Sequence, residues 1–516
     1  MTPWVTRIHA ITAAGHGVEA LVEAVAAGRP LLRPAPYAVE GLRSPFGAFA
    51  GAGQAKELLD SVVNAVLPAE GDCGLVVGTT SGAISGPFER WHRGGGGEEQ
   101  AWRQEPARWV ASRRGLKPVT TVSVACASGA AAFDIARGWL RSGRCARVIV
   151  AGVDALSLYI HAGFAGLGAL SAGPSRPFTP GRDGLMLGEG AAALLLETPE
   201  AARGAGRTAM AALRGIGLSQ DGMHLTAPDP DGAGLVRAMR AALADGRARP
   251  EDVGCLSAHA TGTPFNDAME EKAYAAVFGT TPPAHGIKSI VGHTLGAAGT
   301  VEAALLVAVL AGAHRPPSLP GHPPATTGMG LSVNAAFGGV NVALLFGPPQ
   351  EGPFPSLGAR EAESVRVEGD DFPLATLWPG APPALGRADN YVRAGIAALR
   401  GLQGALTPET AVVLSSESNC RAADLRYHAG LIAQGPARAS RVHFPYTIPG
   451  APLAEAAIPT GLRGPALVLL DGAEAGRTEA RRLVAWGQAP AAVALHIECP
   501  ERSALAEAVR YVPAAP

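Results

Sequence analysis

Residues 118–141 read PVTTVSVACASGAAAFDIARGWLR and contain the most informative feature of the chain. The run 118–125 is apolar, as in a buried strand, and the Ala-rich stretch 130–141 is typical of a helix. Cys126 lies where the strand should give way to the helix. Small residues follow it and leave room for an acyl group, and a helix N-terminus favours the thiolate, the reactive form of cysteine. The stretch predicts a nucleophile, and the alternative is an inert buried cysteine.

Composition narrows the function classes. The 516 residues are 47% hydrophobic and 17% charged, enough for two or three packed units. The 43 basic and 44 acidic residues nearly cancel, so neither nucleic acid nor a membrane surface is an expected partner. Six scattered cysteines without a CxxC pair favour a reducing compartment and argue against zinc. With no signal peptide and no apolar run of about 18 residues, a cytoplasmic enzyme is expected.

Strand-like and helix-like segments alternate over the first two thirds of the chain, which predicts a mixed α/β fold. The strand-like runs are GLVVG (74–78), VTTVSVA (119–125), VIVAG (148–152), AAALLLE (191–197) and VNVALLF (340–346), and helical patterns include 130–141 and 234–243. A Gly-rich loop, RGGGGE at 93–98, could cradle a phosphate, but no strand leads into it and no Lys-Ser/Thr pair follows, so a turn is the favoured interpretation.

These patterns predict a first α/β unit up to about residue 350, a linker rich in Pro, Gly and acidic residues (349–382), and a further α/β unit (383–516). The last unit has strand-like runs at 411–415, 466–470 and 491–497 and a helix at 473–486, in the same order as 73–152. We interpret it as a diverged internal repeat. Alignment by eye puts Leu469 or Leu470 opposite Cys126, so this unit should carry no nucleophile.

Three further segments of the first unit are dense in chemically useful groups. SAHATGTPFND (257–267) holds His259, GIKSIVGHTLGAAGTVE (286–302) holds His293, and NAAFGGVN (334–341) brings two glycines whose backbone could turn N–H groups toward a ligand. Each segment alone is weak, because most histidines are core or surface residues. Their occurrence with Cys126 in one α/β unit is the stronger observation.

These segments resemble the motifs of β-ketoacyl-acyl-carrier-protein synthases, the elongating Cys-His-His ketosynthases of the thiolase superfamily. The resemblance covers about 1–348 and is carried, in order, by VACASG (124–129), SRPFTPGRDGLMLGEGA (175–191), AHATGT (258–263), KSIVGHTLGAAG (288–299) and AFGGVN (336–341). It implies a thiolase-like α/β/α/β/α fold built from two related halves, 1–203 with the nucleophile cysteine and 204–348 with both histidines. A degenerate half-unit, 383–516, is added at the C-terminus.

The resemblance also implies residue roles. Cys126 matches the acylated nucleophile, and His259 and His293 match the pair that acts on the malonyl extender. The other matches are the supporting pair Lys288 and Glu302, the gate Phe337 whose N–H joins that of Cys126 in an oxyanion hole, and the substrate-binding residues Thr261, Thr263, Gly338 and Gly339. Arg182, Asp183 and Glu189 match a segment that supports the site without reacting.

The implied reaction is decarboxylative condensation of a Cys-bound acyl group with malonyl carrier protein, in fatty acid, polyene or polyketide synthesis. No metal or organic cofactor is implied, because the 4'-phosphopantetheine arrives on the carrier protein. The implied partners are acyl carrier protein, its acyl and malonyl thioesters, and a second copy or another ketosynthase-like subunit in a homodimer or heterodimer. The unit 383–516 resembles the N-terminal half of a Cys-less chain-length factor, through FPYTIPGAPLAEAAI at 444–458.

Two residues of this chain differ from the family pattern, and two other functions are possible interpretations. Ala260 stands where the family usually has Gly, and Ala335 stands where it has an aromatic residue, so the pocket could be wider or gated differently. A non-elongating scaffold or malonyl decarboxylase is one alternative. A Cys-His hydrolase is the other, and it leaves the second histidine and Lys288 unexplained.

Overall fold

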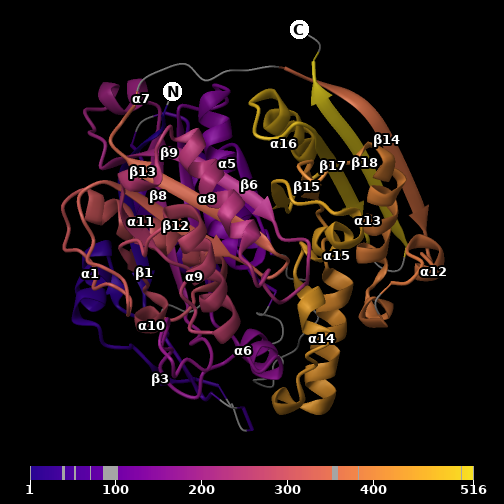
Figure 1. Cartoon of the computed structure of the whole chain (residues 1–516), viewed down its shortest axis with the longest axis horizontal. Coiled ribbons are helices and arrows are strands. Elements are labelled where there is room, and N and C mark those ends of the chain that lie inside the picture. The colour runs from indigo at the N-terminus through magenta and orange to yellow at the C-terminus, as the bar shows by residue number, and fades with distance from the viewer. Residues whose placement is uncertain are drawn as a thin grey trace.

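The computed structural model describes residues 2–37, 41–42, 44–51, 54–69, 71–84, 103–350, 358–381, 383–500 and 503–514. Their long strands join edge to edge into one 16-stranded system, with helices packed on its faces (Figure 1). The loop 93–98 lies outside the described residues.

One arrangement of five strands occurs three times along this system. The first unit has β1(Trp4–Thr12), β5(Gly74–Gly78), β6(Val119–Val122), β7(Arg147–Asp154) and β8(Gly190–Glu197). The second has β9(Ala211–Gln220), β10(Val253–Ser257), β11(Ala284–His285), β12(Met329–Ala335) and β13(Val340–Gly347). The third has β14(Ala359–Gly369), β15(Ala411–Ser415), β16(Ala466–Leu469), β17(Ala492–Glu498) and β18(Ala504–Pro513). Three short strands, β2(Gly15–His16), β3(Arg33–Pro34) and β4(Phe46–Gly47), lie outside this arrangement.

In every unit the spatial order is third, second, fourth, fifth and first strand of that unit. The two pairs that the second strand makes are parallel, and the two that the fifth strand makes are antiparallel. Even an irregularity recurs: β1 has a bulge between Val5 and Arg7, and β14 has one between Glu361 and Glu363. The third unit therefore repeats the first in topology and in detail.

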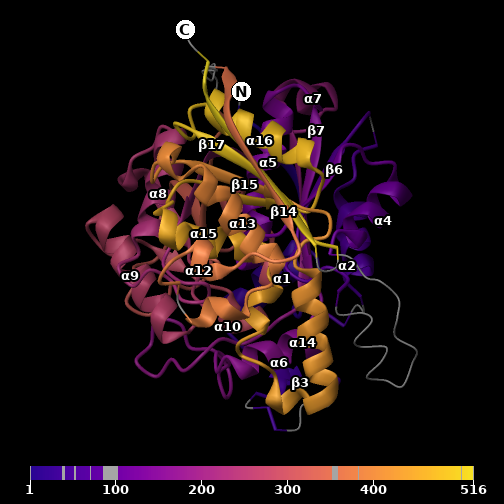
Figure 2. The same cartoon turned by 90° about the vertical axis from the view of Figure 1, so that its right-hand side faces the viewer.

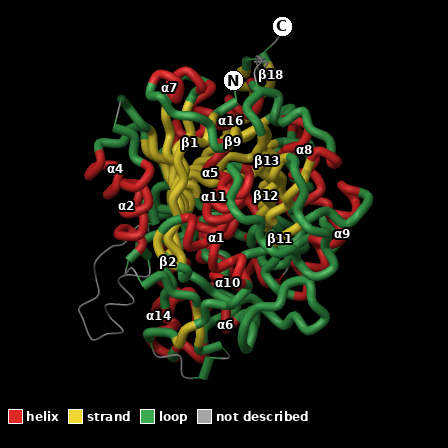
Figure 3. The backbone as a smooth tube through the Cα atoms, turned by 90° about the vertical axis from the view of Figure 1, so that its left-hand side faces the viewer, coloured by secondary structure: helices red, strands yellow, loops and turns green. Residues whose placement is uncertain are grey.

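Helices complete five layers around the first two units. α5(Ser128–Arg141) and α11(Ala298–Leu310) are almost wholly buried and contact strands of both units, and Figure 3 shows them between the two sets of strands. α2(Ala55–Val66) and α4(Glu105–Arg114) cover the outer face of the first unit, and α8(Ala233–Asp245) and α9(Pro264–Phe278) cover that of the second. This is the layered α/β/α/β/α fold that the family resemblance implies. The remaining helices are α1(Val18–Ala27), α6(Leu158–Gly166), α7(Pro199–Gly204), α10(Lys288–Val291), α12(Leu374–Leu377), α13(Asn390–Gly401), α14(Arg421–Gln434), α15(Ala451–Thr460) and α16(Ala473–Ala485).

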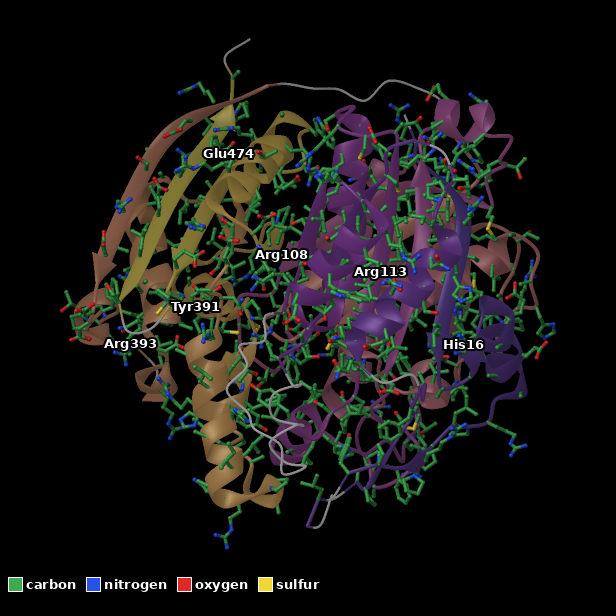
Figure 4. The ribbon with its side chains drawn as sticks, turned by 180° about the vertical axis from the view of Figure 1, so that it is seen from behind. His16, Arg108, Arg113, Tyr391, Arg393 and Glu474 are labelled. Atoms are coloured by element: carbon green, nitrogen blue, oxygen red, sulfur yellow. The ribbon has the colours of Figure 1, made fainter. Side chains whose placement is uncertain are left out.

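The third unit joins the first through the strand that leads to Cys126. β16 lies antiparallel to β6, with Leu469 opposite Val122, and Ser123 N donates to Val468 O at 3.0 Å. Figure 2 shows α16 and α5 close together, and Arg482 of α16 forms a buried ion pair with Asp134 of α5. At the boundary of the two units Arg108 also pairs with Glu417, at 2.8 Å (Figure 4). The two units thus meet edge to edge through equivalent strands.

The structure corrects two sequence interpretations. The stretch 349–382, expected to be a linker, contains β14 and the short helix α12. Most residues of β14 are exposed and many are charged, so the sequence lacks the apolar run of a buried strand. Because β14 belongs to the third set of strands, the third unit begins there. Counting four residues on from the Leu469–Val122 pair puts Ala473 at the position of Cys126, and not Leu469 or Leu470. The strands expected at 74–78 and 411–415 are confirmed to the residue.

No helix among the described residues is both long and apolar enough to cross a membrane.

Candidate active site

Cys126 lies in a tight turn between β6 and α5. The turn is a short 3-10 helix, Ala125–Ala127, and Ala125 has a φ of 49°, which a residue with a side chain seldom adopts. Ser128 holds the turn closed, since its hydroxyl donates to Ala125 O at 2.5 Å and accepts from Val124 N at 3.0 Å. The local sequence therefore fixes the sulfur at the end of a buried strand, with only 6% of the residue exposed.

Burial decides the charge state of this sulfur. It raises the pKa of Cys126 to about 12, against the opposing effect of the nearby Lys288 cation. The sequence led us to expect that the helix N-terminus would favour the thiolate, but desolvation outweighs that effect here. The backbone N–H groups of Cys126 and Phe337 both face the sulfur and act to lower its pKa. Two donors therefore converge beside the nucleophile, as an oxyanion hole requires.

His259 and His293 lie side by side with their rings nearly perpendicular. The ring centroids are 5.3 Å apart and the planes meet at 89°. Burial first, and then the Lys288 cation, keep the pKa of both histidines well below 6.5. Both rings are therefore neutral at physiological pH and can each donate one N–H.

A buried ion pair lies next to the histidines. Lys288 pairs with Glu302, and its Nζ lies 3.4 Å from His259 Nδ1. The second carboxylate oxygen of Glu302 accepts from Asn334 Nδ2 at 2.7 Å. Both charges are almost fully buried, so each depends on the other for its compensation.

Backbone strain recurs in the loops that carry Cys126, His259 and His293. Ala125 precedes Cys126, Ala260 follows His259 with a φ of 44°, and Leu295 lies two residues after His293 with a φ of 53°. Such conformations persist only where the surroundings enforce them, and they gather at functional sites. Ala260 occupies the position at which glycine was expected, and its positive φ explains why glycine suits that position.

One cavity of about 440 Å³ collects most of the predicted site. Cys126, both histidines and Phe337 line it, together with Thr261 and Thr263, whose hydroxyl oxygens are 3.0 Å apart. Gly338 and Gly339 do not line it. Their N–H groups donate to Leu225 O and Ala336 O, and substrate binding by these glycines stays a prediction.

Several positioning carboxylates escaped the sequence analysis. Glu270 on α9 accepts from His259 N and Ala260 N, both at 2.7 Å, and from Tyr274 OH. Asp267 accepts from Gly262 N at 3.1 Å and from Phe178 N at 2.9 Å. The only sequence signal was their position one and two turns into the helix that follows the motif 258–263.

Asp154, at the end of β7, ties the two halves of the site together. It accepts from Thr80 N and Ser81 N in the first unit, and from Gly296 N in the loop after His293. No local motif marks this residue, because its partners lie far away in the sequence.

The segment 175–191 contributes support, as the resemblance implied. Asp183 lines the cavity and accepts from Ser171 Oγ at 2.7 Å. Glu189 accepts from the N–H groups of Ala50 and Leu156, and Arg182 lies 3.8 Å from Glu271.

Behind Cys126 lies a second, much smaller cavity of about 20 Å³. Phe444 and Ile448 of the third unit line it together with Phe164 and Phe337. Phe337 stacks on Phe164 with centroids 5.7 Å apart, and Phe164 meets Phe444 at 5.5 Å. The aromatic row runs from Phe337, beside Cys126, through Phe164 to Phe444 of the third unit.

Arg103 anchors this part of the third unit. It is 2% exposed and pairs with the buried Asp424, and its other N–H groups reach Asn419 and the carbonyls of Thr80 and Thr447. One arginine of the first unit thus holds the wall segment 444–448 in place.

Two family descriptions match this part of the chain. Residues 69–202 match "Beta-ketoacyl synthase, N-terminal domain", and residues 210–322 match "Beta-ketoacyl synthase, C-terminal domain". The "3-oxoacyl-[acyl-carrier-protein] synthase 2" of Mycobacterium bovis is 36% identical over 255 residues, which are 44% of this chain and 61% of that protein. The chain thus spans about three fifths of the length of the curated relatives it matches.

The fold of this chain is also similar to two solved structures. A β-ketoacyl synthase from Burkholderia phymatum is 28% identical with a TM-score of 0.61, covering 68% of this chain and 100% of that one. A structure titled "PfaC Keto synthase-Chain length factor" has a TM-score of 0.75 and covers 99% of this chain and 78% of that one. Its 15% identity supports a likeness of fold alone, and that likeness includes the third unit.

Proposed function

We propose that this chain belongs to the β-ketoacyl synthase family with the thiolase fold, and that it joins an acyl group on Cys126 to a malonyl unit by decarboxylative Claisen condensation. The observation that carries the proposal is the convergence, on one cavity, of a cysteine with two backbone donors and a pair of neutral histidines.

In the first half-reaction the Cys126 sulfur attacks the carbonyl carbon of an acyl carrier thioester. The carbon–sulfur bond to the phosphopantetheine breaks, and its thiolate leaves with the proton that Cys126 gives up. The N–H groups of Cys126 and Phe337 stabilise the tetrahedral oxyanion, and loss of one such donor typically costs about 10²–10³ in rate.

In the second half-reaction malonyl carrier protein replaces the released carrier. His259 and His293 each donate one N–H to the thioester oxygen, which stabilises the enolate as the bond to the carboxylate breaks and carbon dioxide leaves. The enolate carbon attacks the acyl carbonyl, and the Cys126 sulfur departs. Neutral histidines suit this role, because a charged imidazolium would hold the malonyl carboxylate instead of releasing it. The proposed cycle uses no metal or organic cofactor beyond the carrier's phosphopantetheine.

We assign the third unit the place of a partner subunit. β16 already occupies the outer edge of β6, so that edge is not open to a second copy of the chain. One detail supports the equivalence of the two units: Asp154 accepts from Thr80 N and Ser81 N, and Glu498 accepts likewise from Glu417 N and Ser418 N, at matching places after β5 and β15. We propose that the small cavity behind Cys126 receives the acyl chain, and we call it the acyl cavity. Because Phe444 lines it, the third unit would limit the length of the acyl chain that Cys126 carries.

Mass spectrometry tests the proposal directly. The full chain is incubated with an acyl carrier protein thioester and malonyl carrier protein, and the expected products are acyl-Cys126 and a β-ketoacyl carrier protein. Cys126→Ala should abolish both and keep malonyl decarboxylation, since the histidines remain. Acylation that releases only free acid would overturn the proposal in favour of a hydrolase. Decarboxylation without acylation of the wild type would favour a non-elongating subunit.

A further inference from the structure

The cavity of about 440 Å³ that holds Cys126 has an apolar rim. Three loops supply this rim, with Leu167 and Gly168 after α6, Ala227 and Pro228 after β9, and Pro264 and Phe265 at the start of α9. All six rim residues are exposed or half-buried, whereas the cysteine and the two histidines inside are buried. A substrate that reaches the sulfur must therefore pass this rim.

Phe265 is the most prominent residue of the rim. It is 79% exposed, the highest value of any large hydrophobic residue in the part of the chain that the structure describes. Pro264 begins α9, and the next residues, Asn266 and Asp267, are buried, so Phe265 faces outward from the first turn. Exposed apolar patches at the edge of a binding cavity typically mark a surface that a partner covers.

Charge contributes little at this rim. Among the described residues that line the cavity there is no Lys or Arg, and its acids are Asp183 and the buried Asp221. The cations that follow these loops in the sequence, Lys272 and Arg182, both pair with carboxylates of the protein itself. The phosphate of a phosphopantetheine arm would therefore meet no cation where it enters.

The rim is held in place before any partner arrives. His224 Nδ1 accepts from Thr226 N and Ala227 N, at 3.0 and 3.1 Å, which fixes the loop after β9. Asp267 accepts from Gly262 N at 3.1 Å and so fixes the loop that leads into α9. A preformed surface loses little conformational entropy on binding, and an aromatic ring with two rotatable bonds adds little more.

We propose that Phe265 anchors the carrier protein through apolar contact and not through charge. This inference rests on the proposed condensation, in which the acyl and malonyl groups both arrive on a carrier. Aromatic residues are enriched at protein interfaces, and a few such anchors carry most of the binding energy. Because the phosphopantetheine enters beside Phe265, the surface that fits is an apolar patch of the carrier next to the residue that bears this arm.

Steady-state kinetics of the full chain with two malonyl donors test the contact. The acyl group is supplied as a saturating N-acetylcysteamine thioester, and malonyl carrier protein is compared with malonyl-N-acetylcysteamine, which has no protein part. Phe265→Ala should raise the KM for malonyl carrier protein at least about tenfold and leave kcat within about twofold. The KM for the small thioester should not change. Phe265→Leu keeps an apolar side chain and should recover most of the lost affinity.

The matched control is Leu425→Ala, which removes another exposed apolar side chain, 54% exposed on α14. It should change neither KM. The KM of the wild type for malonyl carrier protein should also stay within about twofold between about 50 and about 300 mM sodium chloride, because salt screens charges and not apolar contacts.

Three results would overturn the role of Phe265. One is an unchanged KM for malonyl carrier protein in Phe265→Ala. Another is an equal rise of KM for both donors, which would place Phe265 against the pantetheine arm instead of the carrier. The third is a rise of several fold with salt in the wild type, which would assign recognition to charge.

A binding measurement separates these results from a failure of the proposed function. Fluorescence anisotropy of labelled holo carrier protein should give a Kd that is about tenfold higher for Phe265→Ala than for the wild type, whether or not a product forms. That difference without any β-ketoacyl product would contradict the condensation and support the contact. Equal Kd values beside a normal product would do the reverse.

Discussion

Leu469 of the third unit lies directly opposite Val122 of the first, four residues before Cys126. The strand that carries the nucleophile is therefore held on both edges, by β5 and by β16. The catalytic turn depends on a segment more than 300 residues further along the chain. The third unit therefore helps to position Cys126, as the residues of the sequence motifs do.

Phe444 should set the length of the acyl group. A Cβ atom on Gly163 would lie 2.3 Å from the Phe444 ring, so the two are in tight contact beside the acyl cavity. Phe444→Leu replaces the ring that lines the cavity with a smaller side chain and so enlarges the cavity. The products, measured by mass spectrometry, should shift toward longer acyl chains. Phe372→Leu alters a buried phenylalanine of the same unit that does not line the cavity, and should not shift them. An unchanged product length in a folded Phe444→Leu protein would refute this role.

Cys126 should react slowly with alkylating agents at neutral pH. Its pKa is raised to about 12, so the thiolate fraction keeps growing well beyond the range of an ordinary cysteine. The rate of modification by iodoacetamide, read at Cys126 by peptide mass spectrometry, should rise about tenfold per pH unit from 7 to 10. A plateau near pH 8.5 would show that the sulfur is not desolvated as described.

The Lys288–Glu302 pair should be costly to break. Glu302→Gln leaves the Lys288 charge buried without a carboxylate, and such changes typically cost about 3–5 kcal/mol in the free energy of unfolding. Urea denaturation measures this cost. Glu251→Gln, in the exposed Arg249–Glu251 pair, should change the same quantity by no more than about 0.5 kcal/mol. Similar effects of the two variants would contradict the burial of the pair.

Glu270 should make stability depend on pH in an unusual direction. Burial raises its pKa from 4.5 to about 7, so its contribution to stability is complete below pH 4.5 and is lost as pH rises through 7. The difference in unfolding free energy between wild type and Glu270→Gln, measured at pH 5, 6, 7 and 8, should therefore move against the wild type as pH rises. A constant difference would mean that Glu270 titrates normally.

The convergence of Cys126, His259 and His293 on one cavity was predictable because their sequence signals are local. Cys126 stands between an apolar run and an Ala-rich helix, and each histidine stands in a short loop of small residues. The supporting carboxylates were not, because Asp154 and Glu270 are recognisable only by N–H groups that folding brings to them. The periodicity of a sequence predicts helices and strands, but it does not identify the distant N–H groups that a buried carboxylate will bind.

The third unit illustrates the same limit. Its apolar strands β15 and β16 were visible as runs, but β14 was taken for linker because most of its residues are exposed and charged. The expectation that the helix N-terminus would ionise Cys126 also failed, since burial depends on everything packed around the sulfur.

The charges of β14 have a consequence for how the strand system ends. Matched through the strand registers, the buried Val5 and Ala10 of β1 correspond to Glu361 and Arg366 of β14, both exposed. β1 pairs onward with β9, whereas among the described residues only β18 pairs with β14. An open strand edge invites the strands of other molecules, and charged side chains deter them. The third unit covers the edge of β6 that leads to Cys126, and the charged residues of β14 protect its own open edge against aggregation.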